Sequence, residues 1–163
     1  MTVQKLGQGF AAGFITLVLA TSSPAITPST SGGSNHDRPR IVAFGDSLTA
    51  GLGVAAEETY PAQLQRRLDS RGLEYRVINA GVSGDTTAGG LRRVDWVLKS
   101  RPDIVILELG ANDGLRGLKL QETQANLEKI IQRCRDASAL VVLAGMKLPP
   151  NYGAEYTKRF ESI

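Results

Sequence analysis

The sequence has very few residues of the types that build disulfides and metal sites. Among its 163 residues there is one cysteine, Cys134, and one histidine, His36. A single cysteine excludes a disulfide within the chain, and without a cluster of cysteines and histidines no structural zinc site is expected. Cys134 follows Leu127, Ile130 and Ile131 at helical spacing, so we expect its thiol to be buried by packing. We predict neither a metal ion nor a cofactor.

The chain also lacks a strong excess of charge of one sign. The formal net charge is +3, and the 42% hydrophobic and 21% charged residues are ordinary for a soluble globular protein. So small an excess does not indicate a nucleic-acid partner. The arginines that we interpret as lying on solvated helix faces are Arg66, Arg67, Arg71, Arg92, Arg93, Arg133 and Arg135.

No apolar run is long enough to favour a membrane span, but the N-terminus resembles a targeting segment. Lys5 precedes a short apolar stretch at residues 9–20, and residues 20–22 (Ala-Thr-Ser) form a candidate cleavage site. We predict a signal peptide over residues 1–22 and an exported chain, periplasmic or secreted, with no stable membrane span after its removal. The alternative is an uncleaved anchor or an amphipathic surface helix.

Residues 23–39 have the serine, threonine, proline and glycine content of a linker, so the folded domain is expected over residues 40–163. There, short apolar runs alternate with helical patterns, which predicts an α/β fold with a parallel sheet covered by helices on both faces. The predicted strands are residues 41–44, 75–79, 104–109 and 140–144. The predicted helices are residues 59–71, 86–100, 121–137 and 151–163.

The carboxyl ends of parallel strands meet at one edge of the sheet, where ligands bind. Ser47 offers a hydroxyl and an N–H after the first strand, Gly84 an unobstructed backbone N–H after the second, and Asn112 a side-chain amide after the third. Acyl transfer needs such a nucleophile and such donors for the oxyanion. Taken singly, each residue has an ordinary structural explanation: Ser47 as a helix N-cap, Gly84 as a position with positive φ, and Asn112 as part of a turn. The carboxylates expected to hold these loops by accepting backbone N–H groups are Asp46, Asp85 and Asp113.

These pieces resemble the SGNH (GDSL) hydrolase family, in its branch of arylesterases, acyl-CoA thioesterases I and lysophospholipases. The resemblance covers residues 40–163, and the matching segments are residues 45–48, 83–86, 108–117 and 148–153. It implies a flavodoxin-like three-layer αβα sandwich. It also implies a serine esterase or thioesterase whose partner is a small acyl ester or thioester: an aryl ester, an acyl-CoA or a lysophospholipid.

The resemblance assigns a role to each of the three residues. Ser47 is the nucleophile, which forms the acyl-enzyme, and the first oxyanion donor. Gly84 is the second donor through its backbone, and Asn112 is the third through its side chain. The loops at residues 114–119 and 145–153 are expected to shape the acyl groove.

The fourth element of the family pattern, an Asp-x-x-His that supplies the general base and its orienting carboxylate, does not occur in the chain. His36 lies in the predicted linker and is not expected to replace that base. We therefore expect an incomplete domain that lacks the C-terminal strand and helix, and a chain that is inactive or a fragment. Without the base, residual catalysis of roughly 10³–10⁴ over water is expected.

Two other functions fit parts of the sequence. The first is a non-catalytic ligand-binding remnant that keeps the oxyanion donors without a base. The second is nucleotide binding, because residues 51–56 match Gly-x-Gly-x-x-Ala. That fingerprint belongs at the strand-to-helix turn and needs an acidic residue at the end of the second strand. Here the glycines come well after the strand, and the second strand ends in Ile78 and Asn79, so nucleotide binding is not favoured.

Overall fold

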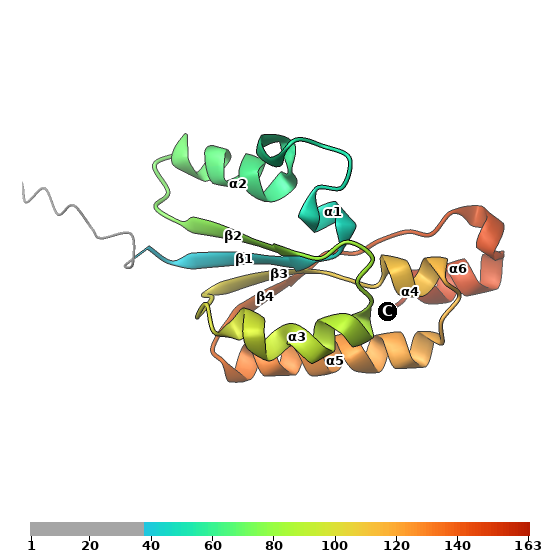
Figure 1. Ribbon diagram of the computed structural model, residues 1–163. Helices are drawn as coiled ribbons and strands as arrows, with labels where there is room; N and C mark the ends of the chain where they lie inside the picture. Colours follow the sequence, from blue (N-terminus) through green and yellow to red (C-terminus); the bar gives the residue numbers. More distant parts are fainter. Residues whose placement is uncertain (1–37) are drawn as a thin grey trace, which may run out of the picture. The chain divides into compact units, whose positions relative to one another are not determined.

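The structure is a computed structural model that describes residues 38–163. The predicted signal peptide, His36 and nearly all of the predicted linker lie outside these residues. The described residues form one parallel sheet with helices on both faces (Figure 1). The predicted α/β class is therefore confirmed.

All neighbouring strands of the sheet are parallel, in the order β2-β1-β3-β4. Phe44 of the first strand lies opposite Ala80 on one side and Leu107 on the other. This is the flavodoxin-like order, as predicted. The strands are β1 (Arg40–Gly45), β2 (Arg76–Gly81), β3 (Ile104–Glu108) and β4 (Leu140–Leu143).

The long predicted helices are present, but the predicted helix ranges do not include two short ones, α1 and α4. The predicted helix at residues 151–163 is a 3₁₀ turn followed by a helix, because Gly153 between them has a φ of +88°. The helices are α1 (Ser47–Ala50), α2 (Tyr60–Asp69), α3 (Thr87–Leu98), α4 (Ala111–Leu115), α5 (Leu120–Asp136) and α6 (Ala154–Glu161). The 3₁₀ turns are η1 (Ala56–Glu58) and η2 (Pro150–Tyr152).

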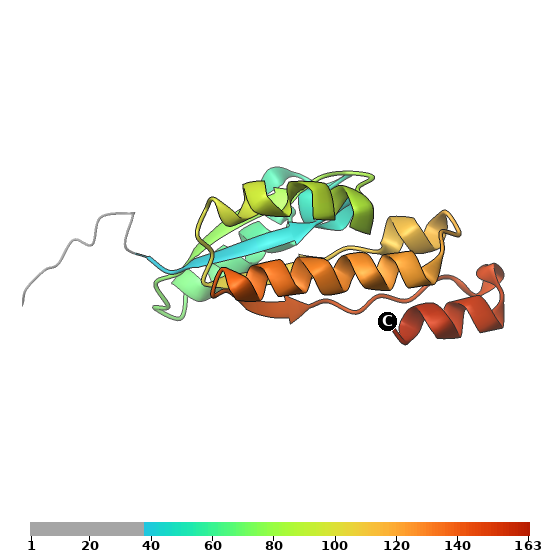
Figure 2. The same ribbon diagram turned by 90° about the horizontal axis from the view of Figure 1, so that it is seen from below.

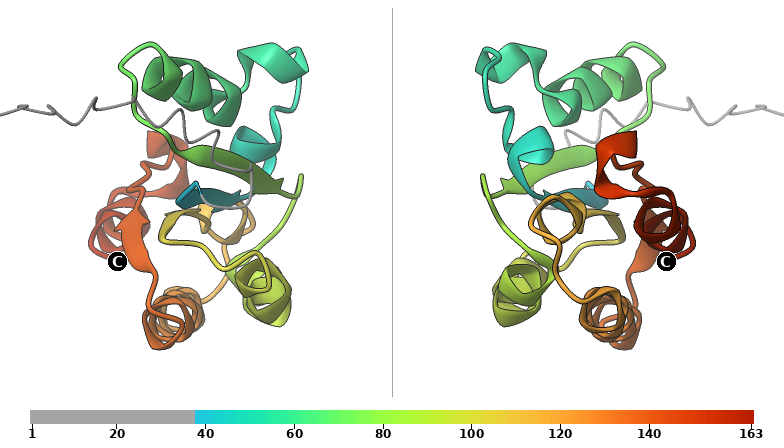
Figure 3. Two further views of the ribbon diagram at one scale, coloured as in Figure 1. Left: turned by 90° about the vertical axis from the view of Figure 1, so that its left-hand side faces the viewer. Right: turned by 90° about the vertical axis from the view of Figure 1, so that its right-hand side faces the viewer.

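The helices form a layer on each side of the sheet. Helices α3 and α5 lie side by side against one face, and α1 and α2 cover the other (Figures 1 and 2). The end-on views in Figure 3 show the three layers that the family resemblance implied. The main core lies between the sheet and the α3–α5 pair. Its fully buried side chains include Val42, Phe44, Val94, Val105, Leu107, Ile130 and Cys134.

Burial differs sharply between the central and the edge strand. Val105 and Leu107 of β3, which point to the same face of the sheet, are 0% exposed, whereas Ile104 and Ile106 on the opposite face are half-buried. The predicted central position of β3 is confirmed, with helices on both faces of the sheet but full burial on one face only. Within the described residues, β4 is an edge strand, and its side chains Leu140, Val142 and Leu143 are 61%, 47% and 44% exposed. The carboxyl ends of β1, β2 and β3 therefore form the well-packed part of the edge where a ligand site is expected.

Candidate active site

Ser47 begins α1, directly after the turn that ends β1. Asp46 is the N-cap of this helix, because its carboxylate accepts the Leu48 N–H at 3.0 Å. The interpretation of Ser47 as a helix N-cap is therefore wrong. Ser47 is partly exposed, and within residues 38–163 neither its hydroxyl nor its N–H has a hydrogen-bond partner. Both groups are open to a ligand.

Gly45 makes room for the side chains packed behind this turn. A Cβ atom there would collide with the Thr49 hydroxyl and lie 2.6 Å from Oε2 of Glu108. The Thr49 hydroxyl donates to that oxygen at 2.7 Å, and the Asp46 N–H approaches it at 3.4 Å. A larger residue at position 45 would separate α1 from β3 and shift Ser47 with it.

Glu108 is a buried carboxyl group that the sequence analysis did not single out. It is 6% exposed, and its partner Thr49 also lies 3.1 Å from the Tyr60 hydroxyl. Burial raises the pKa of Glu108, and the nearby Asp46 carboxylate raises it further. Its second oxygen, Oε1, has no hydrogen-bond partner among the described residues. The signal that could have revealed it is a single acidic residue at the end of an otherwise apolar strand.

Gly84 lies in the exposed loop after β2 with a φ of +78°, as the conformational explanation of this glycine predicted. A Cβ there would meet only Nη2 of Arg116, at 3.6 Å, so conformation rather than crowding favours glycine. The same Nη2 donates to the Gly84 carbonyl at 2.9 Å. The Gly84 N–H has no partner in the part of the chain that the structure describes, so it is as available as the N–H of Ser47.

Asn112 links the loops that carry Ser47 and Gly84. Its amide Nδ2 donates to Oδ2 of Asp46 at 3.0 Å and to the carbonyl of Asp85 at 2.9 Å. The residue lies inside α4, so its interpretation as part of a turn is wrong. Both amide hydrogens are engaged, and donation to a ligand requires one of these bonds to be exchanged. The three predicted site residues are thus brought together through their immediate neighbours.

The three aspartates predicted to hold the loops do so. Asp46 accepts the Leu48 N–H, and Asp85 accepts the Thr86 N–H at 3.1 Å. Asp113 is 2% exposed and accepts the Thr87 N–H at 2.8 Å. The Thr87 hydroxyl also donates to Asp113, at 2.6 Å.

Arg93 corrects one of the arginine interpretations. We expected it on a solvated helix face, but its side chain is 18% exposed and pairs with Asp85 at 2.7 Å. Its neighbour Arg92 is exposed, as expected. The helical pattern hid this difference because Asp85 precedes the helix, two turns away from Arg93. The spacing Asp85, Gly89, Arg93 was the signal that could have revealed it.

Two cavities lie near this edge of the sheet. The smaller, about 280 Å³, is lined mostly by apolar side chains and adjoins the neighbours of Ser47 and Asn112. Its lining residues are Leu48, Ala111, Leu115, Met146, Lys147, Leu148 and Pro149. The predicted groove loops at residues 114–119 and 145–153 both contribute to it. Its position beside Leu48 and Ala111 makes it the better candidate for an acyl group.

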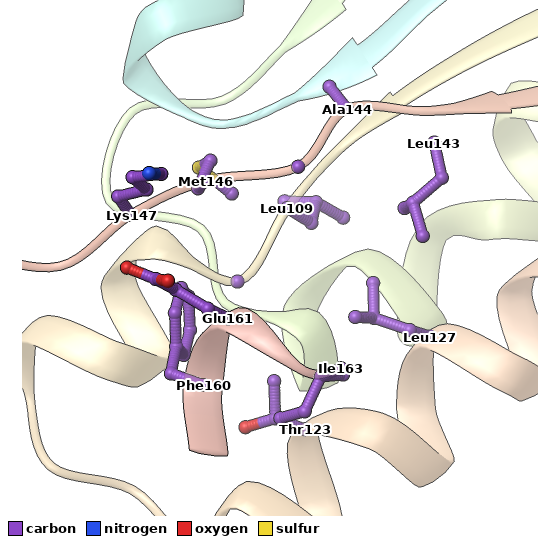
Figure 4. A pocket seen from close by; sticks show the side chains of 12 residues that line it. Leu109, Thr123, Leu127, Leu143, Ala144, Met146, Lys147, Phe160, Glu161 and Ile163 are labelled. Carbon is purple, nitrogen blue, oxygen red and sulfur yellow. The ribbon is translucent and has the colours of Figure 1, made fainter. Parts of the chain in front are cut away.

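The larger cavity, about 360 Å³, lies between the ends of β3 and β4, α5 and α6 (Figure 4). Leu109, Leu127 and Leu143 line one part of it, and Lys147 and Glu161 lie toward the other. Neither Ser47 nor Gly84 lines it. Among residues 38–163 no group of three histidine, cysteine or acidic side chains is arranged to hold a metal ion. No helix in that range is long and apolar enough to cross a membrane.

Comparison with known proteins places this geometry in a family. The model of the GDSL-like lipase/acylhydrolase family matches residues 43–162. Esterase TesA of Pseudomonas aeruginosa is 44% identical over 124 residues, which are 76% of this chain and 62% of that protein. The thioesterase 1/protease 1/lysophospholipase L1 of Escherichia coli is 40% identical over 124 residues, 76% of this chain and 58% of its own length. The chain thus spans about three fifths of these curated relatives.

Solved structures give the same result. AlinE4, an SGNH-hydrolase family esterase, is 48% identical with a TM-score of 0.73, and the match covers 76% of this chain and 67% of that one. The crystal structure of TesA is 45% identical with a TM-score of 0.73, over 74% and 68% of the two chains. At these identities the likeness extends beyond the bare fold.

Proposed function

The chain belongs to the GDSL-like lipase/acylhydrolase family, and from that premise we propose that it is a carboxylic ester hydrolase with Ser47 as its nucleophile. The observation that carries the proposal is the pair of unengaged N–H groups, those of Ser47 and Gly84, on two loops that Asn112 joins. Backbone N–H groups held in advance of the reaction are what a developing oxyanion requires.

The proposed reaction is a two-step acyl transfer. Ser47 Oγ attacks the carbonyl carbon of the ester as its proton passes to a base from the solvent, and the carbonyl oxygen becomes an oxyanion held by the N–H groups of Ser47 and Gly84. Asn112 becomes a third donor when one of its two present bonds is exchanged for the oxyanion. The bond to the leaving oxygen or sulfur then breaks, the leaving group takes up a proton from the solvent, and the acyl group stays on Ser47. Water attacks the acyl carbon, the bond to Ser47 Oγ breaks as Oγ regains a proton, and the acid is released.

The substrate class follows from the 280 Å³ cavity beside Leu48. Its apolar lining by Leu115, Leu148 and Pro149 suits an acyl chain, since such pockets bind by removing apolar surface from water. Relatives named esterase, arylesterase and thioesterase 1/lysophospholipase L1 support aryl esters, acyl-CoA thioesters and lysophospholipids as the candidates.

Labelling of Ser47 by a fluorophosphonate tests the nucleophile. We expect an adduct on the peptide that contains Ser47, formed much faster than any adduct on the Ser47→Ala variant. Equal rates for the two proteins would contradict the proposal and favour the non-catalytic ligand-binding alternative. Mass spectrometry of the digested protein locates the adduct and excludes modification elsewhere.

The general base is the second part of the proposal. The printed sequence holds no Asp-x-x-His, and His36 lies outside the described residues. We propose that turnover by these 163 residues is therefore slow, at roughly the 10³–10⁴ over water that an oxyanion hole and binding alone provide. Added imidazole is expected to raise the hydrolysis of a p-nitrophenyl ester. The matched Ser47→Ala reaction gives the rate due to imidazole itself, and an increase equal in both proteins would contradict the proposal.

Export is proposed on the sequence alone. Lys5 and the apolar residues 9–20 have the arrangement of a signal peptide, and the domain at residues 40–163 would then act in the periplasm or outside the cell. The intact mass of the chain recovered from a periplasmic fraction tests this. A mass reduced by residues 1–22 is expected, and an unprocessed chain in the cytosol would contradict it.

A further inference from the structure

We propose that Arg93 is a positioning residue, which fixes the Ser47 turn against the Gly84 loop so that their two N–H groups face one oxyanion. The inference rests on the proposed function, because it takes these N–H groups to be the oxyanion donors. Arg93 itself touches no reacting atom. It acts through the backbone of the segments that carry the donors.

One planar guanidinium reaches three acceptors on these segments. Its Nε donates to Oδ2 of Asp85 at 2.7 Å, next to Gly84. Its Nη1 donates to the Ala80 carbonyl at 2.7 Å, near the end of β2. Its Nη2 donates to the Gly45 carbonyl at 2.9 Å, at the end of β1. The fixed fork of an arginine sets the directions of all three bonds at once, which an ammonium group cannot do.

Packing keeps the guanidinium in this orientation. Its carbon lies 4.5 Å from the centre of the Phe44 ring, and the side chains of Arg93 and Asp85 are 18% and 11% exposed. Charge-assisted bonds with so little access to water are stronger than those on an open surface. We call the three bonds of the Arg93 guanidinium the Arg93 clamp. It resists small displacements of the Ser47 turn and of the Gly84 loop.

Gly89 allows the pair to form. It lies four residues after Asp85, which precedes α3, and four residues before Arg93, with which it shares a face of α3. A Cβ atom at Gly89 would collide with Oδ1 of Asp85. The absent side chain lets the carboxylate fold back along the helix to meet the guanidinium. The spacing Asp-x-x-x-Gly-x-x-x-Arg thus encodes the clamp in the sequence.

The clamp complements the link made by Asn112. Asn112 joins the loops through the Asp46 carboxylate and the Asp85 carbonyl. Arg93 joins them through different acceptors, the Gly45 carbonyl and the Asp85 carboxylate. The Gly45 carbonyl also accepts the Val82 N–H at 3.0 Å, so the turn keeps one bond to the β2 loop when Arg93 is replaced. A substitution is therefore expected to loosen the geometry without separating the loops.

The test compares the full chain with Arg93→Lys and Arg93→Ala, each reacted with a fluorophosphonate in a fixed concentration of imidazole. We expect the labelling rate of Ser47 to fall by about 10- to 100-fold in both variants, because displaced donors lose much of their effect. Rates are corrected for the folded fraction found by urea unfolding. Methylguanidinium is expected to restore much of the rate of Arg93→Ala. The control Arg92→Ala, an exposed arginine on the same helix, is expected to stay within about twofold of wild type.

The outcomes separate the inference from the proposed function. If wild type labels no faster than Ser47→Ala, the proposed function fails and the inference fails with it. If wild type labels but Arg93→Lys labels equally fast, the inference alone is overturned. It is also overturned if methylguanidinium has no effect on Arg93→Ala, or if both Arg93 variants are unfolded, which would assign Arg93 to stability only.

Discussion

Glu108 carries a carboxyl group into the interior directly behind the turn of Ser47. Burial first, and then the charge of Asp46, raise its pKa, so the folded protein holds this proton more tightly than the unfolded chain does. The resulting stabilisation is complete below the unfolded pKa of about 4.3. It is lost as the pH rises through the raised pKa of the folded state. The side chain of the variant Glu108→Gln stays neutral at all pH values, so its unfolding free energy is not expected to fall in this way as the pH rises.

Urea unfolding from about pH 4 to about pH 8 measures the effect. The unfolding free energy of Glu108→Gln, relative to wild type, should rise across this range, whatever their difference at the acid end. Glu57→Gln is the matched control, because Glu57 is exposed in η1. A parallel pH dependence in wild type and Glu108→Gln would contradict the assignment.

Single residues differed in how far the sequence disclosed them. Ser47, Gly84 and Asn112 were predicted as site residues because each follows a strand, and the ends of parallel strands meet at one edge of the sheet. Arg93 and Glu108 were not, because their significance lies in what approaches them from other segments. Arg93 in a helical pattern is predicted to be solvated unless Gly89, which leaves room for its partner Asp85, is also considered. The position of Asn112 after β3 could be predicted, but its two hydrogen bonds depend on loop geometry that a linear pattern does not contain.

At the scale of secondary-structure elements, Thr87 joins the start of α3 to α4 and α5. Its hydroxyl donates to Asp113 at 2.6 Å and accepts from Asn126 at 3.2 Å, and Thr87 is 0% exposed. The variant Thr87→Val keeps the shape but leaves both partners short of one bond. We expect it to lower the unfolding free energy by about 2 kcal/mol, since bonds to charged groups contribute roughly 1.5–3.

The control for this prediction is Thr87→Ser, which keeps the hydroxyl and loses only a methyl group. Urea unfolding of the three proteins compares them directly. Thr87→Ser should lie closer to wild type than Thr87→Val does. If the valine variant is the more stable of the two, hydrogen bonding at the start of α3 is not what stabilises this junction.

An element was predictable where it was long enough to show the period of its own type, which is about two residues for a strand and about 3.6 for a helix. The four strands and helices α2, α3 and α5 lie close to their predicted ranges, since each has enough residues to display a period. Helices α1 and α4, of four and five residues, are too short for one. They form because tertiary contacts fix them: Asp46 caps α1, and Asp113 of α4 is tied to Thr87. Local pattern does not report such contacts.

At the scale of the whole molecule, the sheet is unequally covered. Val105 and Leu107 of the central strand β3 are buried, while Leu140, Val142 and Leu143 of β4 are exposed. The N–H groups of Leu140 and Ala144 donate to the carbonyls of Asp103, just before β3, and of Leu107 in β3. By the alternation of a parallel ladder, those of Val141 and Leu143 then point away from the sheet. An edge with free backbone groups and apolar side chains is a template for association with another chain.

We therefore expect the 163-residue chain to self-associate as its concentration rises, and Val142→Lys to reduce this association by placing a charge on the β4 edge. Light scattering after size exclusion measures the mass at each concentration. The control Leu52→Lys adds the same charge at a side chain that is 74% exposed in the loop between α1 and η1, away from β4. If both variants reduce the mass equally, net charge rather than the β4 edge controls association. If neither variant reduces the mass, the β4 edge is not the contact. A contact formed through β4 would bury the lysine of Val142→Lys and would therefore be disrupted.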